Sequence, residues 1–321
     1  MPAAMVVAVA ALVSSGAGAS AAVTQSSARC TKTLAAGHGD LNGFVRHLRP
    51  GAVGCLRGTF HRSLAIRNGG FRLLSAPGSR ATIDGMLYIS HTAHDVVLAR
   101  LVLRSTVTPN VRINGSRITI RRSVITNGHT GICVSVGGGS ERWGVAHSVA
   151  LLHNRIHDCG RLPATNHDHG IYVEGATATV IAGNLIYDNA DRGIQFYPNA
   201  QGSVVTNNVI NGNGEGVSFG SESAGGEYRS AYASSGNLVA RNIISNSRER
   251  YNVEAWWGGP VGVANVARDN CLWGGAQGNV DGLAGGFLAI ANRIAKPGFV
   301  NAARGDFRLR PGSRCAGMGP H

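Results

Sequence analysis

The sequence predicts an all-β chain wound into a parallel β-helix, and three observations predict it: composition, alternation and an internal repeat. The 321 residues include 46 glycines, and 43% are hydrophobic while only 15% are charged, which is typical of many turns around a sizeable core. Short stretches alternate apolar and polar residues, as strands do because neighbouring side chains point to opposite faces. A repeat of 23 residues is too short for a βαβ crossover, but it suits one coil of a solenoid.

The first segment of the chain is predicted to be a signal peptide over residues 1–21. It contains the apolar run MVVAVAALV, then small residues, and an Ala-Ser-Ala sequence that fits a cleavage site. The run is too short to span a bilayer, as is every other apolar run, so we expect an exported chain with no membrane segment. The rest is expected to divide into an N-terminal cap and first coil, the β-helix, and a C-terminal cap or tail, over residues 22–60, 61–290 and 291–321.

One repeating element of the β-helix is an apolar alternation followed by Asn, one residue and Ile. Equivalent positions stack in a solenoid, so these Asn side chains are expected to form one buried column that satisfies turn backbone and neighbouring amides. Ser123 takes the same position earlier in the chain, and Asn270 a later one. The role of this column is structural, and its members are Asn154, Asn184, Asn208 and Asn242.

A second element follows each of these and begins with Gly, in the sequences GICV, GIYV, GIQF and GVSF. The glycines are 39, 23 and 23 residues apart, at Gly131, Gly170, Gly193 and Gly216. Alternate residues of each strand must point inward and fill the core as stacked layers. They are Ile171, Val173, Ile194, Phe196, Val217 and Phe219.

The six cysteines agree with export. None forms a CxxC pair, which argues against a zinc site, and an even number in an exported chain suggests disulfides. Fifteen pairings are possible; pairing sequence neighbours closes the shortest loops, although six small buried thiols are the alternative. The expected bonds are Cys30–Cys55, Cys133–Cys159 and Cys271–Cys315.

The repeats HGIYVEG, IAGNLIYDNADRGIQFYPNA and VVTNNVINGNGEGVSFG resemble the right-handed parallel β-helix of the pectate-lyase-like superfamily. The opening LNGFVRHLRPGAVGCLRGTF and the ending KPGFVNAARGDFRLRPGSRCAGMG are similar to the first coil and the end of secreted members. The resemblance covers most of the chain after residue 30 and implies the handedness of the coil. It leaves the activity open, because the superfamily includes lyases, hydrolases, epimerases and proteins without known chemistry.

Ionisable residues recur in the position before each repeated Gly. Thr130, His169, Arg192 and Glu215 occupy it, and stacked strands lie about 4.8 Å apart, so a column is expected at one strand entrance. Asp168 and Asp191 are expected beside it, and Tyr172, Gln195, Ser218, Glu174 and Tyr197 on the outward face of the strands. Insertions at residues 137–145, 160–169 and 220–235 border this face and suggest the walls of a groove.

This pattern fits proton abstraction from an acidic polysaccharide by a lyase or epimerase, which needs a base and positive charge for the developing enediolate. We expect His169 as the base, oriented by Asp168, and Arg192 as the partner of a uronate carboxylate. The net charge of +13 would attract a polyanion. The sequence NHDHG resembles the Asp-Pro-His-Asp signature of mannuronan C5-epimerases at His167 and Asp168, but Asn166 replaces its first Asp and the Pro is missing. The expected substrate-binding residues are His167, Tyr172, Glu174, Gln195, Tyr197, Glu215 and Trp256.

Other interpretations remain open at this point. A hydrolase could use two of Asp168, Asp191 and Glu215, a non-catalytic protein could only bind glycan, and the column could be a solvated coil edge. No cofactor or metal is expected, because the outward face offers Glu174 alone to calcium, although a calcium site from Asp188, Asp191 and Glu215 is possible. We expect a monomer that binds no nucleic acid, since no recognised nucleic-acid module is present.

Overall fold

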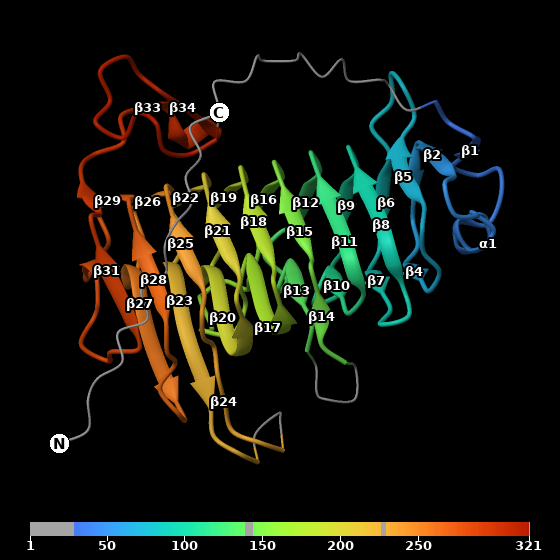
Figure 1. Ribbon diagram of the computed structural model, residues 1–321. Helices are drawn as coiled ribbons and strands as arrows, with labels where there is room; N and C mark the ends of the chain where they lie inside the picture. Colours follow the sequence, from blue (N-terminus) through green and yellow to red (C-terminus); the bar gives the residue numbers. More distant parts are fainter. Residues whose placement is uncertain (1–28, 139–143, 226–228, 321) are drawn as a thin grey trace, which may run out of the picture.

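The computed structural model describes residues 29–138, 144–225 and 229–320, so the predicted signal peptide lies outside the described residues. Within them the chain forms the predicted parallel β-helix (Figure 1). Each full coil contributes three strands, and strands of successive coils pair in parallel to give three rows. The prediction of an all-β solenoid is therefore confirmed.

The three rows follow one another along every coil. The first row consists of β4 (Leu64–Ile66), β7 (Leu87–Ile89), β10 (Val111–Ile113), β13 (Val134–Val136), β17 (Ile171–Thr177), β20 (Arg192–Gln201), β23 (Glu215–Glu222), β27 (Tyr251–Gly258) and β30 (Gly278–Val280). The second consists of β1 (Lys32–Ala35), β2 (Val53–Arg57), β5 (Arg72–Ser75), β8 (His94–Ala99), β11 (Ser116–Arg121), β15 (Ala150–Leu152), β18 (Val180–Ala182), β21 (Val204–Thr206), β25 (Leu238–Ala240), β28 (Asn265–Arg268) and β31 (Phe287–Ile290). The third consists of β3 (Thr59–Phe60), β6 (Thr82–Asp84), β9 (Val102–Arg104), β12 (Val124–Thr126), β16 (Arg155–His157), β19 (Leu185–Tyr187), β22 (Val209–Asn211), β26 (Ile243–Ser245), β29 (Cys271–Trp273) and β32 (Arg293–Ile294).

A few elements lie outside these rows. The short strand β14 (Ala146–His147) pairs with β11 and β17, and β24 (Tyr232–Ala233) pairs antiparallel with the end of β23. The helix α1 (Leu41–Arg46) follows Asp40, whose carboxylate accepts hydrogen bonds from the backbone N–H groups of Asn42 and Gly43 and so caps the helix. Near the end of the chain, β33 (Phe299–Asn301), the 3₁₀ helix η2 (Ala302–Arg304) and β34 (Asp306–Leu309) form a hairpin.

The core is stacked as the alternation predicted. All six expected inward residues are fully buried, and Ile171, Ile194 and Val217 lie in register on successive coils. The rings of Phe196 and Phe219 stack with centroids 5.4 Å apart. Because each layer lies in register with the one below, an apolar side chain lies above and below each inward residue, which gives the close packing that a core requires.

The predicted Asn column forms, and it continues further than predicted. Each amide donates through Nδ2 to Oδ1 of the next Asn, at 2.9–3.1 Å from Asn154 through Asn184, Asn208, Asn242 and Asn270 to Asn292. The backbone N–H of Ser123 donates to Asn154 Oδ1, which places Ser123 at the start of the column. The residue before each Asn has positive φ, for example His153 at 54° and Arg241 at 59°. This conformation costs roughly 1–2 kcal/mol for a residue other than Gly, and the buried amide bonds beside it offset that cost.

The three expected disulfides are all present, with Cα atoms 5.5–5.6 Å apart. Cys30–Cys55 lies at the first coils, and Cys133–Cys159 lies beside the 160–169 insertion. Cys271–Cys315 attaches the tail to β29. The tail then packs along the outer side of the third row, where Phe307 contacts Tyr187 at 5.0 Å between centroids and Arg155 Nη2 donates to Gly305 O at 3.2 Å.

The last coil is not covered by the tail in the part of the chain that the structure describes. Ala289 continues the inward row of Ala267, yet it is exposed, and Leu288, Ile290 and Ile294 around it are also exposed. Figure 1 shows the tail beside β19 and β22 rather than across the end of the coil. No helix in the described residues is long and apolar enough to span a bilayer.

Candidate functional site

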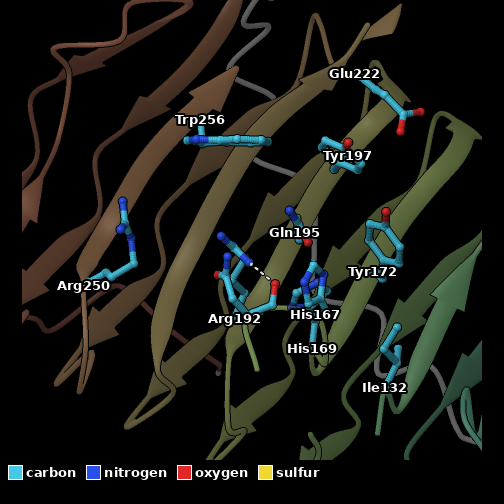
Figure 2. A pocket seen from close by; sticks show the side chains of 11 residues that line it. Ile132, His167, His169, Tyr172, Arg192, Gln195, Tyr197, Glu222, Arg250 and Trp256 are labelled. Carbon is cyan, nitrogen blue, oxygen red and sulfur yellow. Dashed lines mark hydrogen bonds between the residues drawn. The ribbon is translucent and has the colours of Figure 1, made fainter. Parts of the chain in front are cut away.

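A cavity of about 450 Å³ opens on the outer face of the first strand row. Its walls come from β17, β20, the end of β23, β27 and the 160–169 insertion, so segments far apart in sequence meet there. Figure 2 shows their side chains converging on one space. The lining residues are Ile132, Asn166, His167, His169, Tyr172, Arg192, Gln195, Tyr197, Glu222, Arg250 and Trp256.

His169 lies at the entrance of β17, as expected, and it is buried rather than part of a solvated coil edge. Burial lowers the pKa of this imidazole well below its usual value, and the nearby charge of Arg192 lowers it further. The ring meets Tyr172 edge to face at 5.3 Å. Its buried Nδ1 has no hydrogen-bond partner among the described residues. His169 is therefore a neutral ring that lines the cavity and has a nitrogen without a protein partner.

The expectation that Asp168 orients His169 is wrong. The Asp168 carboxylate turns away from the cavity and accepts hydrogen bonds from Arg161 Nε at 2.5 Å and Thr165 Oγ1 at 3.2 Å. Asp191 accepts from the backbone N–H groups of Asn166 at 2.9 Å and Asp168 at 2.6 Å. Buried backbone donors of a loop need acceptors, and these two carboxylates provide them. Asp168 and Asp191 therefore hold the 160–169 insertion in place, and neither is among the residues that line the cavity.

Arg192 begins β20, and only 5% of it is exposed. Its Nε lies 3.0 Å from Oε2 of Glu215, the residue that pairs with it on β23. Its Nη1 donates to the backbone oxygen of Asn166 at 3.0 Å (Figure 2). The predicted column of His169, Arg192 and Glu215 exists, but it is buried rather than a solvated coil edge. Glu215 lies behind Arg192 and does not line the cavity, contrary to its expected role in binding substrate.

Glu174 was also expected on the open face, and the structure buries it instead. Its carboxylate accepts from Ser135 Oγ at 3.2 Å and lies 3.7 Å from Arg112 Nη1. The segment after β13 covers it: a Cβ at Gly138 would lie 1.9 Å from Glu174 Cδ, so this backbone passes directly over the carboxylate. The alternation of β17 alone does not show this cover, because it comes from the preceding coil.

Aromatic side chains form a row along one side of the cavity. The ring of Tyr172 lies 6.4 Å from that of Tyr197, which lies 6.5 Å from Trp256. Gly220 makes room for this row, because a Cβ there would lie 2.8 Å from Tyr197 Cδ2. Trp256 is 55% exposed. Its neighbour Trp257 packs against the core instead and donates to Gly285 O.

Arg250 is a charged residue of the cavity that the sequence interpretation missed, as it missed Glu222. It lines the cavity, and its Nε and Nη2 bind both oxygens of Glu254 at 2.8–3.0 Å. Glu254 is 1% exposed. A signal was present in the sequence RERYNVEAWW: Glu254 lies two residues before Trp256, on the same face of the strand.

The carboxylates proposed for calcium do not converge. Asp188 is exposed and binds Arg248 at 3.0 Å, whereas Asp191 and Glu215 are buried with the partners given above. Across residues 29–138, 144–225 and 229–320, no three His, Cys, Asp or Glu side chains form a group that could hold a metal ion. The described residues therefore do not fit a calcium ion, which needs six or more oxygen ligands.

Comparison with known proteins identifies the fold. No curated protein sequence matches the chain. Among solved structures, the pectate lyase Pel9A aligns over 89% of this chain and 91% of its own, at 10% identity and a TM-score of 0.56. The Dettilon tailspike protein aligns over 82% of this chain and 62% of its own, at 13% identity and a TM-score of 0.50. An alginate lyase from Paenibacillus sp. str. FPU-7 covers 83% and 100%, at 15% identity and a TM-score of 0.44.

At such identities a likeness between structures shows a shared fold alone. The sequence itself matches the family model described as "Right handed beta helix region" over residues 87–270, more than half of the chain. These residues include β7 to β28 and all of the strands around the cavity. The chain therefore belongs to the right-handed β-helix family.

Proposed function

We propose that this protein is exported and acts on an acidic, uronate-containing polysaccharide, as a lyase or epimerase that removes the proton α to a carboxylate. The observation that carries the proposal is the meeting of a neutral buried imidazole, two guanidinium groups and an aromatic row in one cavity. Each matches one need of the reaction: a base, positive charge for the enediolate and a surface for sugar rings.

The proposed reaction begins with His169, which takes the proton from the carbon next to the uronate carboxylate. The electron pair of the broken C–H bond moves onto the carboxylate, and Arg192 and Arg250 stabilise the second negative charge. In a lyase, the electrons then form a C=C bond as the glycosidic C–O bond breaks, and Tyr172 or Tyr197 protonates the leaving oxygen. In an epimerase, a proton returns to the opposite face of the same carbon and the chain stays intact.

The aromatic row and the charge distribution support a polymeric substrate. Tyr172 and Tyr197 come from the neighbouring coils of β17 and β20, and Trp256 comes from the coil of β27 beyond Gly220 of β23, so sugars of one glycan would lie across several coils. Residues 29–122 contain fourteen arginines and one lysine against three aspartates and no glutamate. This excess of positive charge would attract a polyanion over distance.

Export rests on two features of the sequence. The predicted signal peptide precedes the described residues, and all six cysteines form disulfides, which persist in oxidising compartments. The pectate lyase that shares the fold is in keeping with a glycan substrate, although the proposal depends on the side chains of this cavity.

The test is incubation of the purified protein with a panel of uronate polymers. An ultraviolet-absorbing unsaturated chain end identifies a lyase, and uptake of deuterium from D₂O without cleavage identifies an epimerase. New reducing ends without ultraviolet absorbance would overturn the proposal in favour of hydrolysis. Binding without any chemical change would overturn the proposed activity and identify a glycan-binding protein, in which the aromatic row binds the sugar rings.

A further inference from the structure

Four charged side chains form a compact cluster at one side of the cavity. Arg192 and Glu215 begin paired strands of neighbouring coils, and Arg250 and Glu254 come from the next coil. Arg192 Nε lies 3.0 Å from Glu215 Oε2, and Arg250 Nε lies 3.9 Å from the same oxygen. Both guanidinium groups line the cavity and neither carboxylate does. The carboxylates therefore support the arginines from behind.

The two carboxyl groups of this cluster are buried beside each other. Glu215 is 3% exposed and Glu254 is 1% exposed. Both oxygens of Glu254 are bound by Arg250, whereas Oε1 of Glu215 has no hydrogen-bond partner in the described part of the chain. Two neighbouring buried carboxylates repel each other if both are ionised, which favours protonation of one of them. The unpartnered oxygen, Glu215 Oε1, is the atom at which we place this proton.

The surroundings of Glu215 agree with this placement. Burial raises its pKa to about 8, and the contact with Glu254 acts in the same direction, while Arg192 and Arg250 oppose them. From the preceding coils, His169 faces Arg192, and burial keeps that ring neutral. From the following coil, Asp281 adds a negative charge near Arg250.

We propose that Glu215 and Glu254 are positioning residues that share one proton and hold Arg192 and Arg250 as a two-guanidinium site for a carboxylate. With the proton in place the cluster has two positive charges and one negative charge, so it attracts an anion. Without the proton the four charges cancel. The cluster is therefore a pH-sensitive anion site, which weakens as the proton leaves. The identity of the anion as a uronate rests on the proposed function, but the shared proton does not.

Binding and protonation must be coupled in both directions. If the protonated cluster binds the carboxylate more tightly, the bound carboxylate raises the proton affinity of Glu215 by the same factor. Folding is linked to the same proton. Because the pKa of Glu215 is raised in the folded protein, its contribution to stability is present below about pH 4.5 and is lost as pH rises through about 8.

The first experiment detects the proton directly, without a ligand. Infrared difference spectra of the full-length protein should show the C=O stretch of a protonated carboxylic acid at neutral pH, which disappears as pH rises through about 8. The band should be absent in Glu215→Gln, and its midpoint should move to lower pH in Glu254→Gln, since one neighbouring negative charge is removed. A wild-type protein without this band at neutral pH would overturn the proposal, whatever its activity.

The second experiment measures binding of a galacturonate trimer and a mannuronate trimer by calorimetry. Between about pH 7 and pH 9.5 the wild type should lose roughly thirtyfold in affinity, as expected if only the protonated cluster binds and its single proton has a pKa near 8. Glu215→Gln should keep a constant affinity, and Arg250→Gln should lose most of it. Glu249→Gln is the matched control, because Glu249 is exposed and does not line the cavity; it should keep the wild-type pH dependence.

The outcomes separate the two proposals. A titrating band together with pH-independent binding would disprove the link between the proton and the anion site. If neither trimer bound, the assignment of a carboxylate ligand would fail along with the proposed substrate, while the infrared band would still decide whether the proton is shared. Thermal unfolding of each variant at two pH values shows whether it has folded.

Discussion

At the scale of single residues, burial decides what His169 can do. A solvent-exposed His is partly protonated near pH 6.5, and a protonated imidazole cannot accept a proton. The low pKa of His169 keeps the ring unprotonated, but it also makes the ring a weaker base. The substrate must therefore be made more acidic, and the positive charges of Arg192 and Arg250 beside the carboxylate are suited to do this.

We expect His169→Gln to reduce turnover of an acidic glycan by about 10²–10⁴-fold, because removal of a well-placed general base has this effect. The binding constant for the uronate trimer should change little. In the wild type, the loss of activity caused by protonation of His169 should occur well below pH 6.5, since the pKa is lowered. Initial rates as a function of pH provide the measurement.

His147→Gln is the control for this variant. His147 is exposed in β14 and lies outside the cavity, so its replacement should leave the pH profile unchanged. Near-wild-type turnover by His169→Gln would rule out His169 as the base.

At the scale of elements, the Asn column joins the coils where strand direction changes. In the side chain of Asn208, both the nitrogen and the oxygen of the amide form hydrogen bonds. Its Nδ2 donates to Ile181 O, Thr206 O and Asn242 Oδ1 at 2.8–3.0 Å. Its Oδ1 accepts from the backbone N–H and the side-chain amide of Asn184. The column therefore satisfies backbone groups that the turn would leave buried without partners.

We expect Asn208→Ala to destabilise the fold by roughly 3 kcal/mol or more, because it leaves several buried polar groups without a partner at about 1–3 kcal/mol each. The midpoint of denaturant unfolding should fall accordingly. Asn301→Ala is the comparison, since Asn301 is exposed and makes no capping hydrogen bond at η2, and it should have almost no effect. Equal stabilities of the two variants would show that the column does not stabilise the fold.

At the scale of the whole molecule, stability and the candidate site are divided between different sides of the coil. The cavity lies on the first strand row, whereas the tail packs on the outer side of the third row against Val209 and Ile243. The Cys271–Cys315 bond fixes the tail there, and the Cys133–Cys159 bond lies next to the insertion that forms one wall of the cavity.

We expect a variant with Cys271→Ser and Cys315→Ser to release the tail without loss of glycan binding. A disulfide typically contributes about 2–4 kcal/mol, so trypsin should cleave the variant at arginines of the tail, such as Arg308 and Arg310, much faster than the wild type. Mass spectrometry identifies the cleavage sites, and calorimetry with the uronate trimer measures binding.

The matched variant, with Cys133→Ser and Cys159→Ser, should show the opposite pattern: weakened binding and a protected tail. Loss of binding in the tail variant, with the cavity side otherwise folded, would contradict this division of the molecule.

The regular part of the fold was determined by the sequence. Parallel stacking repeats the same contacts at each coil, so the position of a residue within its repeat already fixes its neighbours. This is why the inward rows and the Asn column from Asn154 to Asn242 followed from the repeat, whereas the pairing of the cysteines followed from the shortness of the loops between sequence neighbours. The closeness of His169, Arg192 and Glu215 followed in the same way.

The tertiary structure decided which groups the side chains of the candidate site contact. Several of their hydrogen-bond and ion-pair partners lie in segments that interrupt the repeat. The 160–169 insertion needs acceptors for its own N–H groups and takes the carboxylates of Asp168 and Asp191 away from the cavity. The segment around Gly138 covers Glu174, and the coil of β27 supplies Arg250 with its carboxylate Glu254. Burial, finally, depends on every coil and loop around a group together, so only the folded chain sets the proton affinities of His169 and Glu215.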